Sequence, residues 1–475
     1  SRYSPDGRIL PPDDSLNLKT KEWGTRWQRD HDLIPQIIDQ LHLLFTQAKQ
    51  ELQQLDPITA SQVDTHSKHL ANNRAKSTDG FSTPEVKQLP PPAQEDLANL
   101  LNLFERSLAF PLPLLLNLVA LLGKPPPSQE DRPITITSPI YSLWSKIRRH
   151  LVQDWANSTA GWWDDAVKGS SSLQAGLLRR LGEETAYLLD LSHIGLYWDM
   201  EKFYDNISLL HLLQQANNLS YPKLPLALSF QLHVAPRILA AQGGVSQPVI
   251  VYNSIIAGCT YSSEFTRITL HHILSCHNRQ FPTAPTRQFF DDLSQAFTGL
   301  EHSIQQEAIL SASTLVSKLR AIRLVISKKS QVVATHLSTA QNISQKLKHK
   351  VTLKAATTVR DLGLEATAGA RRSTTIQTKR IDKAHGRTKR LQILGKFSKK
   401  ASKLFATNLV PVATYGASAQ GFSPAQTNKL RKIAGAAALI PGAAHDLTAT
   451  IHITFGPAKD PAISIPIQQL KDWLA

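Results

Sequence analysis

Residues 287–294 read Arg-Gln-Phe-Phe-Asp-Asp-Leu-Ser, and the adjacent carboxylates of Asp291 and Asp292 guide the interpretation of the whole chain. Two aromatic residues lead directly into the two acids, and Pro282 and Pro285 supply turn signals in front of them. This pattern predicts a hairpin that holds carboxylates at its tip. Adjacent like charges repel each other unless a cation lies beside them. The pair therefore indicates either a divalent-metal site for phosphoryl transfer or an ordinary solvated acidic turn.

The amino-acid composition indicates the broad class of protein. The chain has 475 residues, 41% of them hydrophobic, which is enough for a sizeable core in several domains or one large domain. Its two cysteines, Cys259 and Cys276, exclude a disulfide framework and predict an intracellular protein. The apolar run 108–123 is short for a membrane span and contains two prolines, so we expect a buried helix and no membrane association. A first residue Ser1 and a single methionine, Met200, predict a piece of a longer product.

Positive charge is concentrated in one part of the chain. The formal net charge is +16, and residues 311–405 hold 22 Lys and Arg side chains but only three acids, Asp361, Glu365 and Asp382. The other residues are close to neutral, with 31 basic and 34 acidic side chains. A local excess of this size attracts polyanions, and the scarcity of aromatic residues in it argues against a membrane surface. Nucleic acid is therefore the expected partner, with a solvated basic face as the alternative.

A third acid, Asp199, ends a strand-like apolar run. Leu-Tyr-Trp precedes it at 196–198, and Met-Glu-Lys-Phe-Tyr-Asp205 follows it. An acid at the end of a buried strand is costly unless it is paired or binds metal. Carboxylates from two strands can clamp two metal ions about 4 Å apart, and Asp199 could face Asp291 and Asp292 in this way. The alternative for Asp199 is a helix N-cap, and both roles are compatible.

Further motifs occur in a fixed order around these acids. The segments are Lys124 with Arg132-Pro-Ile-Thr-Ile, Asp199-Met-Glu-Lys-Phe-Tyr-Asp205, Gly258-Cys-Thr-Tyr-Ser-Ser263, Phe289-Phe290-Asp291-Asp292, Leu324-Val-Ile-Ser-Lys-Lys329-Ser330, Asp361-Leu-Gly363 and Pro411-Val-Ala-Thr-Tyr-Gly416. In order and spacing over residues 76–435, the chain resembles a reverse transcriptase of the non-LTR retrotransposon type. That is the jockey-like or LINE-like group, with divergent copies in protist and algal genomes. Each motif alone is weak, and their shared order is the stronger signal.

The resemblance implies an RNA-directed DNA polymerase that transfers nucleotides by a two-metal-ion mechanism. Its partners would be an RNA template, a DNA primer and deoxynucleoside triphosphates, within a nuclear or cytoplasmic ribonucleoprotein. Asp199 and Asp291 would bind two Mg²⁺ ions, which Mn²⁺ could replace, and Asp292 would support them. One ion would lower the pKa of the primer 3′-hydroxyl, and the other would neutralise the leaving pyrophosphate. The oligomeric state is not predicted.

The resemblance also implies roles for other residues. Lys124 and Arg132 would hold the triphosphate, with ordinary surface charge as the alternative. Tyr204 would block a ribose 2′-hydroxyl, with a core aromatic as the alternative. Gly258 would lead into a helix that packs under the nascent base pair. Lys329 would either protonate pyrophosphate or orient a turn, and its neighbour Lys328 competes for that role.

The fold implied by the resemblance is α+β, a right-hand polymerase with fingers, an antiparallel palm sheet with helices, and a helical thumb. We expect a partly helical N-terminal extension over 1–75, fingers over 76–185 and a palm over 186–350. A primer-grip region, basic thumb and C-terminal connection would occupy 351–475. Apolar spacing over 374–405 predicts a helix with a basic face, which suits a template–primer backbone.

Several positions depart from the family pattern. Ala257 replaces the usual Gln and Thr260 the usual Pro, which affects template positioning but leaves the expected metal site intact. Asp361 replaces the Tyr of the Tyr-Leu-Gly motif. An alignment on Gln242-Gly243 would restore a Gln-Gly pair, but Gly258 is the glycine that leads directly into the helix. Any endonuclease or RNase H segment of the parent element is expected outside these residues.

Two other functions remain open from the sequence. An RNA-directed RNA polymerase also pairs carboxylates from two strands, and Asp205 could read the ribose, although Phe290 stands where that class has Gly. A catalytically inactive RNA-binding remnant is the third hypothesis, and the retention of all three aspartates argues against long decay. A cluster of ligand-type residues, His271, His272, Cys276 and His277, invites a zinc hypothesis. Packing or surface histidines are favoured, because no Cys-x-x-Cys partner exists.

Overall fold

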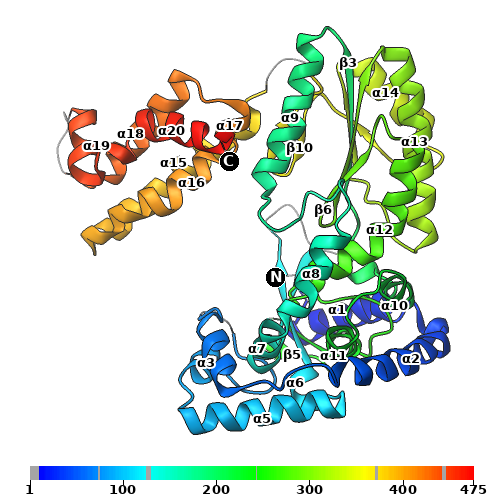
Figure 1. The fold of residues 1–475 in the computed structure, drawn as a ribbon. Coiled ribbons are helices and arrows are strands. Elements are labelled where there is room, and N and C mark those ends of the chain that lie inside the picture. Colours follow the sequence, from blue (N-terminus) through cyan, green and yellow to red (C-terminus); the bar gives the residue numbers. More distant parts are fainter. Residues whose placement is uncertain are drawn as a thin grey trace. The chain divides into compact units, whose positions relative to one another are not determined.

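The computed structural model describes residues 10–72, 75–124, 130–241, 243–369, 373–440 and 446–474, without the side chain of Lys399. Gln242 of the rejected alignment, and Arg371 and Arg372 of the basic segment, lie outside the described residues. The chain forms two compact units, and each is discontinuous in sequence (Figure 1). Unit 1 comprises Ser1–Trp162, Met200–Cys276 and Ser317–Val325, and unit 2 comprises Trp163–Asp199, His277–Val316 and Ile326–Ala475. These units are defined by contacts and not by function, so the four expected functional segments remain a prediction.

Unit 1 is mainly helical. Its helices are α1 (Pro12–Trp27), η1 (His31–Leu33), α2 (Ile34–Leu52), α3 (Ala60–Lys68), α4 (Thr83–Lys87), α5 (Pro91–Ser107), α6 (Leu112–Leu115), α7 (Pro139–Ile147), α8 (Arg149–Thr159), η2 (Phe203–Asn206), α10 (Leu209–Asn218), α11 (Lys223–Val234) and most of α12 (Ser262–Gln280). Many of the short helices begin after residues that can cap them. Ser82 is an example, because its side chain accepts a hydrogen bond from the backbone amide of Glu85. The Glu85 side chain in turn accepts one from the backbone amide of Ser82.

The prediction of one buried helix over residues 108–123 is wrong. This run forms the short helix α6 and then strand β1 (Asn117–Gly123). Its two prolines fit only the first turn of a helix. Strand β1 then pairs antiparallel with β2 (Asp131–Ile136) and parallel with β4 (Arg237–Ala241), and β5 (Gly244–Val245) completes a four-stranded sheet. Pairing on both sides satisfies the backbone groups that a helix would otherwise have satisfied.

Unit 2 is built around a five-stranded sheet in the order β6–β7–β3–β8–β9. The strands are β3 (Ser192–Trp198), β6 (Thr286–Phe289), β7 (Asp292–Gly299), β8 (Gln331–Ala334) and β9 (Lys354–Ala355). Strand β3 is antiparallel to both of its neighbours, β7 and β8, and β9 joins β8 in parallel. The predicted α+β class is therefore confirmed, with sheets rich in antiparallel pairs. The right-hand polymerase arrangement stays a prediction.

Strand β3 forms the middle of this sheet because most of its side chains are buried. Ile194, Leu196 and Trp198 are each exposed by 2% or less. Helix α9 (Ser172–Leu188) packs against β3 (Figure 1). Helix α14 (Leu337–Leu347) packs against β8. A Cβ atom at Gly195 would lie only 2.8 Å from the ring of Tyr197. Glycine at this position therefore lets the Tyr197 ring lie back along the strand.

The remaining elements of unit 2 are a small hairpin and a helical region. The hairpin consists of β10 (Val359–Asp361) and β11 (Leu364–Ala366). The helices are α13 (Glu301–Ala321), which continues into unit 1, α15 (Thr375–Gly395), η3 (Lys399–Lys403), η4 (Phe405–Leu409), α16 (Val410–Thr414), α17 (Ala417–Gln420), α18 (Pro424–Ala437), α19 (Leu447–Phe455), η5 (Pro457–Lys459) and α20 (Pro461–Leu474). The helical region has its own core, which includes Ile381, Leu391, Phe405, Leu430 and Ile451. Helix α15 confirms the helix predicted within 374–405, and it ends at Gly395.

Candidate active site

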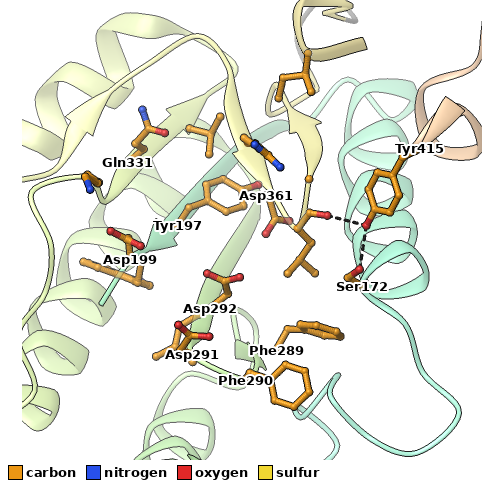
Figure 2. Close-up of a pocket in the computed structure, with 18 of the residues that line it drawn as sticks. Ser172, Tyr197, Asp199, Phe289, Phe290, Asp291, Asp292, Gln331, Asp361 and Tyr415 are labelled. Carbon is orange, nitrogen blue, oxygen red and sulfur yellow. Dashed lines mark hydrogen bonds between the residues drawn. The ribbon is translucent and has the colours of Figure 1, made fainter. Parts of the chain in front are cut away.

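A pocket of about 1110 Å³ in unit 2 collects the predicted carboxylates. Asp199, Asp291 and Asp292 all line it, and Figure 2 shows the three carboxylates near one another. Lys329 lines the same pocket, whereas Lys328 is not among the described residues around it. The four residues predicted to act in catalysis therefore surround one space.

The register of the sheet explains why the acids meet. Trp198 at the end of β3 pairs with Leu293 of β7. Asp199 comes directly after Trp198, and Asp292 comes directly before Leu293. Because the two strands are antiparallel, these acids lie at the same end of adjacent strands. Residues far apart in the chain are thus brought together by backbone pairing alone.

The turn between β6 and β7 presents Asp291. Phe289 pairs with Asp292, so Phe290 and Asp291 form a two-residue connection. Phe290 has a left-handed backbone with φ of 54°, which costs a non-glycine residue about 1–2 kcal/mol. The Gln288 side chain donates a hydrogen bond to the Phe290 carbonyl at 3.1 Å, and the rings of Phe289 and Phe290 meet edge to face at 5.1 Å. These contacts hold a strained turn at the pocket (Figure 2), and such strain often marks a functional site.

The segment around Lys329 fixes the backbone of Asp199. The Asp199 amide donates to Ser330 Oγ at 3.0 Å, and the Ser327 amide donates to the Asp199 carbonyl at 2.8 Å. The Lys329 amide donates to Ser327 Oγ at 3.1 Å, and Ser330 is fully buried. This turn therefore locks the end of β3 and places Lys329 at the pocket.

The three acids form a concentrated negative charge. Burial raises the pKa of Asp291, and the charge of Asp199 raises it further. Partial desolvation raises the pKa of Asp292 to about 6, and the charges of Asp291, Asp361 and Asp199 add to this effect. Part of the Asp292 side chain nevertheless remains accessible to solvent. Such repulsion is relieved when a cation binds between the carboxylates.

The donor set fits a hard divalent cation that is completed by its substrate. In the described part of the chain, no group of three or more His, Cys, Asp or Glu side chains is arranged to hold a metal ion by itself. Mg²⁺ commonly takes only one or two carboxylates and completes its coordination with water and substrate phosphates. Asp199 and Asp291 offer oxygen ligands of that kind, and Asp292 lies beside them.

An ion-pair network that sequence reasoning missed lies next to the acids. Asp361, 5% exposed, is bound by Arg179 at 2.8 Å and by Arg180 at 3.3 Å, both from α9. Arg179 also binds Asp165 at 2.9 Å, and Arg180 binds Glu183 at 2.7 Å. The one available signal was that Asp361 replaces the expected Tyr within a basic segment. Its partners lie about 180 positions earlier, where no local pattern identifies them.

Basic side chains line another part of the same pocket. They are Arg360 of β10 and Lys379, Arg380 and Lys383 of α15. Lys379 and Lys383 are four positions apart, so they share one face of the helix. The pocket thus combines a cluster of carboxylates with a cluster of cations. That combination suits a polyanion whose phosphates contact the cations while one end reaches the acids.

Lys124 and Arg132 belong to unit 1, on the β1–β2 hairpin. Lys124 Nζ binds Glu130 Oε2 at 2.5 Å, and its backbone amide donates to the Glu130 carbonyl at 2.9 Å. Arg132 is exposed and pairs with Leu122. The structure therefore brings these two predicted residues onto one hairpin, and their triphosphate role stays a prediction.

Tyr204 and Gly258 also belong to unit 1. Tyr204 is half-buried, and its ring meets that of Phe203 edge to face at 5.4 Å. Gly258 is exposed in the turn before α12, and a Cβ atom there would meet only the Thr135 carbonyl, at 3.8 Å. Neither observation tests the role that the resemblance implies for these residues.

The His and Cys residues of the cluster on α12 differ in burial, from the exposed His272 to the buried His277. His272 Nε2 lies 3.7 Å from the sulfur of Cys276, and His277 is fully buried with Nε2 3.0 Å from Ser311 Oγ. Among the described residues, nothing assembles the three or more ligands that a zinc site needs. His277 therefore packs within the fold and His272 lies at the surface, which are the two alternatives to a zinc site that the sequence left open.

Comparison with known proteins adds no identification. None of the known family models matches this chain, and a search of curated proteins gave no significant match. Within the described ranges, no helix is long and apolar enough to cross a bilayer.

Proposed function

We propose that this chain is an RNA-directed DNA polymerase of the non-LTR retrotransposon type. The observation that carries the proposal is the meeting of Asp199 with Asp291 and Asp292 at the end of two antiparallel strands. Two-strand carboxylate clusters of this kind support nucleotidyl transfer. The basic side chains of α15 in the same pocket supply contacts for a nucleic acid backbone.

The residues of the pocket have different roles in the proposed reaction. Asp199 and Asp291 would hold the divalent cations, and bound Mg²⁺ would supply charge neutralisation at the reacting phosphate. Asp292 supports the cluster from the first position of β7. Lys329 reaches the pocket from the turn that also holds the Asp199 backbone, so it can neutralise or protonate a departing phosphate.

The environment of Asp205 favours this function over an RNA-directed RNA polymerase. Asp205 is 9% exposed, and its carboxylate accepts a hydrogen bond from Trp27 Nε1 at 2.9 Å. Arg237 lies 3.9 Å from the same oxygen, and burial raises the pKa of Asp205. An acid engaged in the interior of unit 1 is poorly placed to read the hydroxyl of an incoming ribose.

Primer extension tests the proposal. Purified protein would be mixed with an RNA template, a DNA primer and Mg²⁺, and would be given either deoxynucleotides or ribonucleotides. We expect extension with deoxynucleotides, its loss with EDTA, and its recovery with Mg²⁺ or Mn²⁺. Extension only with ribonucleotides would identify an RNA polymerase. RNA binding without any extension would identify an inactive remnant.

A further inference from the structure

The short β10–β11 hairpin borders the pocket and depends on contacts outside itself. It has three cross-strand pairs, Val359–Ala366, Arg360–Glu365 and Asp361–Leu364, and such a small two-stranded hairpin is barely stable alone. Its turn consists of Leu362 and Gly363, with φ of 47° and 84°. A left-handed conformation at Leu362 persists only where the surroundings impose it.

The base of the hairpin is clamped to α9. Asp361 is held by Arg179 and Arg180, as described above. Leu364, which is fully buried, lies so close to α9 that a Cβ atom at Gly176 would come within 2.6 Å of it. This side of the hairpin is therefore fixed to the same helix that packs against β3.

The turn of the hairpin is held by two residues from the helical region, Arg380 and Tyr415, which we call the latch. Tyr415 OH donates to the Leu362 carbonyl at 3.0 Å, and Arg380 Nη2 donates to the Gly363 carbonyl at 2.6 Å. Ser172 Oγ lies 2.9 Å from Tyr415 OH, so a residue of α9 supports the latch (Figure 2).

The two latch residues also hold each other. Arg380 Nη1 donates to the Tyr415 carbonyl at 2.7 Å, and its guanidinium carbon lies 4.8 Å from the centre of the Tyr415 ring. A Cβ atom at Gly363 would lie 2.9 Å from Tyr415 and 3.1 Å from Arg380. Glycine is thus needed at position 363 both for its positive φ and for this close approach.

Arg380 connects the turn to the basic surface of the pocket. It lies on α15 between Lys379 and Lys383, and all three line the pocket together with Leu362 and Gly363. The carboxylates of Asp199 and Asp291 line it as well. Arg380 therefore connects α15 to the turn directly through the Gly363 carbonyl, and indirectly through Tyr415, which binds the Leu362 carbonyl.

We propose that Arg380 and Tyr415 are positioning residues that transmit the binding of a nucleic acid backbone on α15 to the β10–β11 hairpin. The inference rests on the proposed function and adds to it a specific mechanical link. A strand held by Lys379 and Lys383 would then be kept in register with the carboxylates, because the latch fixes the distance between α15 and the hairpin. Neither latch residue needs to touch the reacting atoms.

Hydrogen–deuterium exchange tests the link without requiring activity. The amides of residues 359–366 would be followed with and without a short RNA–DNA duplex, in the parent protein, Tyr415→Phe and Arg380→Lys. We expect the duplex to slow exchange in the parent protein. In each variant, the factor by which the duplex slows exchange should be at least about fivefold smaller. Duplex affinity of Tyr415→Phe should stay within twofold of the parent, because Tyr415 is not one of the basic side chains that line the pocket. Tyr187→Phe, at an exposed tyrosine of α9, is the matched control and should behave as the parent.

Kinetics supply a second readout. Each latch variant should lower kcat for primer extension about fivefold to tenfold with unchanged KM for the nucleotide, and the double variant should be no slower than the slower single variant. Unchanged exchange in 359–366 on duplex binding, or protection retained in both variants, would overturn the inference. A duplex affinity of Tyr415→Phe that falls in step with its kcat would overturn it as well. A parent protein that binds the duplex without extending it contradicts the proposed function alone, since exchange still decides the role of the latch.

Discussion

The backbone amide of Asp199 donates a hydrogen bond to the side-chain oxygen of Ser330 at 3.0 Å. Ser330 Oγ also lies 3.3 Å from the Asp199 carbonyl, to which it can donate. A buried serine directly before β8 therefore holds both polar groups of the Asp199 backbone. This contact connects the Lys329-Ser330 segment with the Asp199 segment, which lies 131 positions earlier.

Replacing Ser330 with Ala should disturb Asp199 without touching its carboxylate. We expect a loss of about 1–2 kcal/mol in the free energy of unfolding, because the partly buried amide of Asp199 loses its acceptor. Primer extension should slow more than RNA binding weakens. Urea unfolding and extension rates measure the two effects, with Ser303→Ala on the exposed surface of α13 as the control. Equal stability of Ser330→Ala and the parent would show that this hydrogen bond is dispensable.

Two glycines of unit 2 should respond in opposite directions to alanine. Gly195→Ala should destabilise the protein by about 1–3 kcal/mol, because the new methyl group would overlap the Tyr197 ring. Gly182→Ala should stabilise it by up to about 1 kcal/mol, because Gly182 lies inside α9 with open space beside it. Thermal unfolding of both variants measures the contrast. A stable Gly195→Ala variant would mean that Tyr197 moves freely.

Acid should destabilise unit 2 through His193. Burial, with the charge of Arg180, lowers the pKa of His193 to about 4, whereas an unfolded histidine titrates near 6.5. Between these values the unfolded state binds the proton and the folded state does not. The folded state is therefore most stable, as far as His193 is concerned, above about pH 6.5. As pH falls from there to about 4, the free energy of unfolding drops by at most about 3 kcal/mol.

His193→Gln isolates this effect. Glutamine keeps a hydrogen-bonding group near Thr298 Oγ1, which lies 2.8 Å from His193 Nδ1, but it does not titrate. The difference in unfolding free energy between parent and variant, measured from pH 7 to pH 4.5, should shrink as pH falls. The difference is the useful quantity because His233 in unit 1, whose pKa burial lowers to about 3, contributes to both curves. Parallel curves would contradict the assignment.

Tyr204→Val tests whether Tyr204 excludes ribonucleotides. If the ring blocks a ribose 2′-hydroxyl, the smaller side chain should raise incorporation of ribonucleotides relative to deoxynucleotides at least tenfold. If the ring only packs against Phe203, stability should fall without any change in sugar preference. Steady-state incorporation of each nucleotide type by parent and variant separates these outcomes.

The short-range parts of the site could be predicted from sequence because they depend on local patterns. Apolar residues before Asp199 and before Asp291 predicted a strand and a hairpin, and the structure has β3 and the β6–β7 hairpin there. The structure then places both acids at one pocket. The expectation that they act together came from the cost of an unpaired acid at the end of a buried strand, and the resemblance added to it.

Long-range partners could not be predicted in this way. Nothing near Asp361 indicates that Arg179 and Arg180 bind it, because ion pairs across the chain leave no periodic pattern. The latch hydrogen bonds of Tyr415 and Arg380 to backbone carbonyls carry even less sequence signal. The prediction of a helix over residues 108–123 was wrong for a related reason. Pairing with β2 and β4, which both lie outside this run, makes part of it a strand.

The central claim is that Asp291, presented by the strained turn after Phe290, is a metal-binding carboxylate of a polymerase. Asp291→Asn removes the charge and keeps the shape, and Asp96→Asn on the exposed surface of α5 is the matched control. In Mg²⁺-dependent primer extension on an RNA template, Asp291→Asn should lose at least about 100-fold in rate. Its affinity for RNA should stay within twofold of the parent, and Asp96→Asn should retain full activity. Extension by Asp291→Asn at the parental rate would contradict the account.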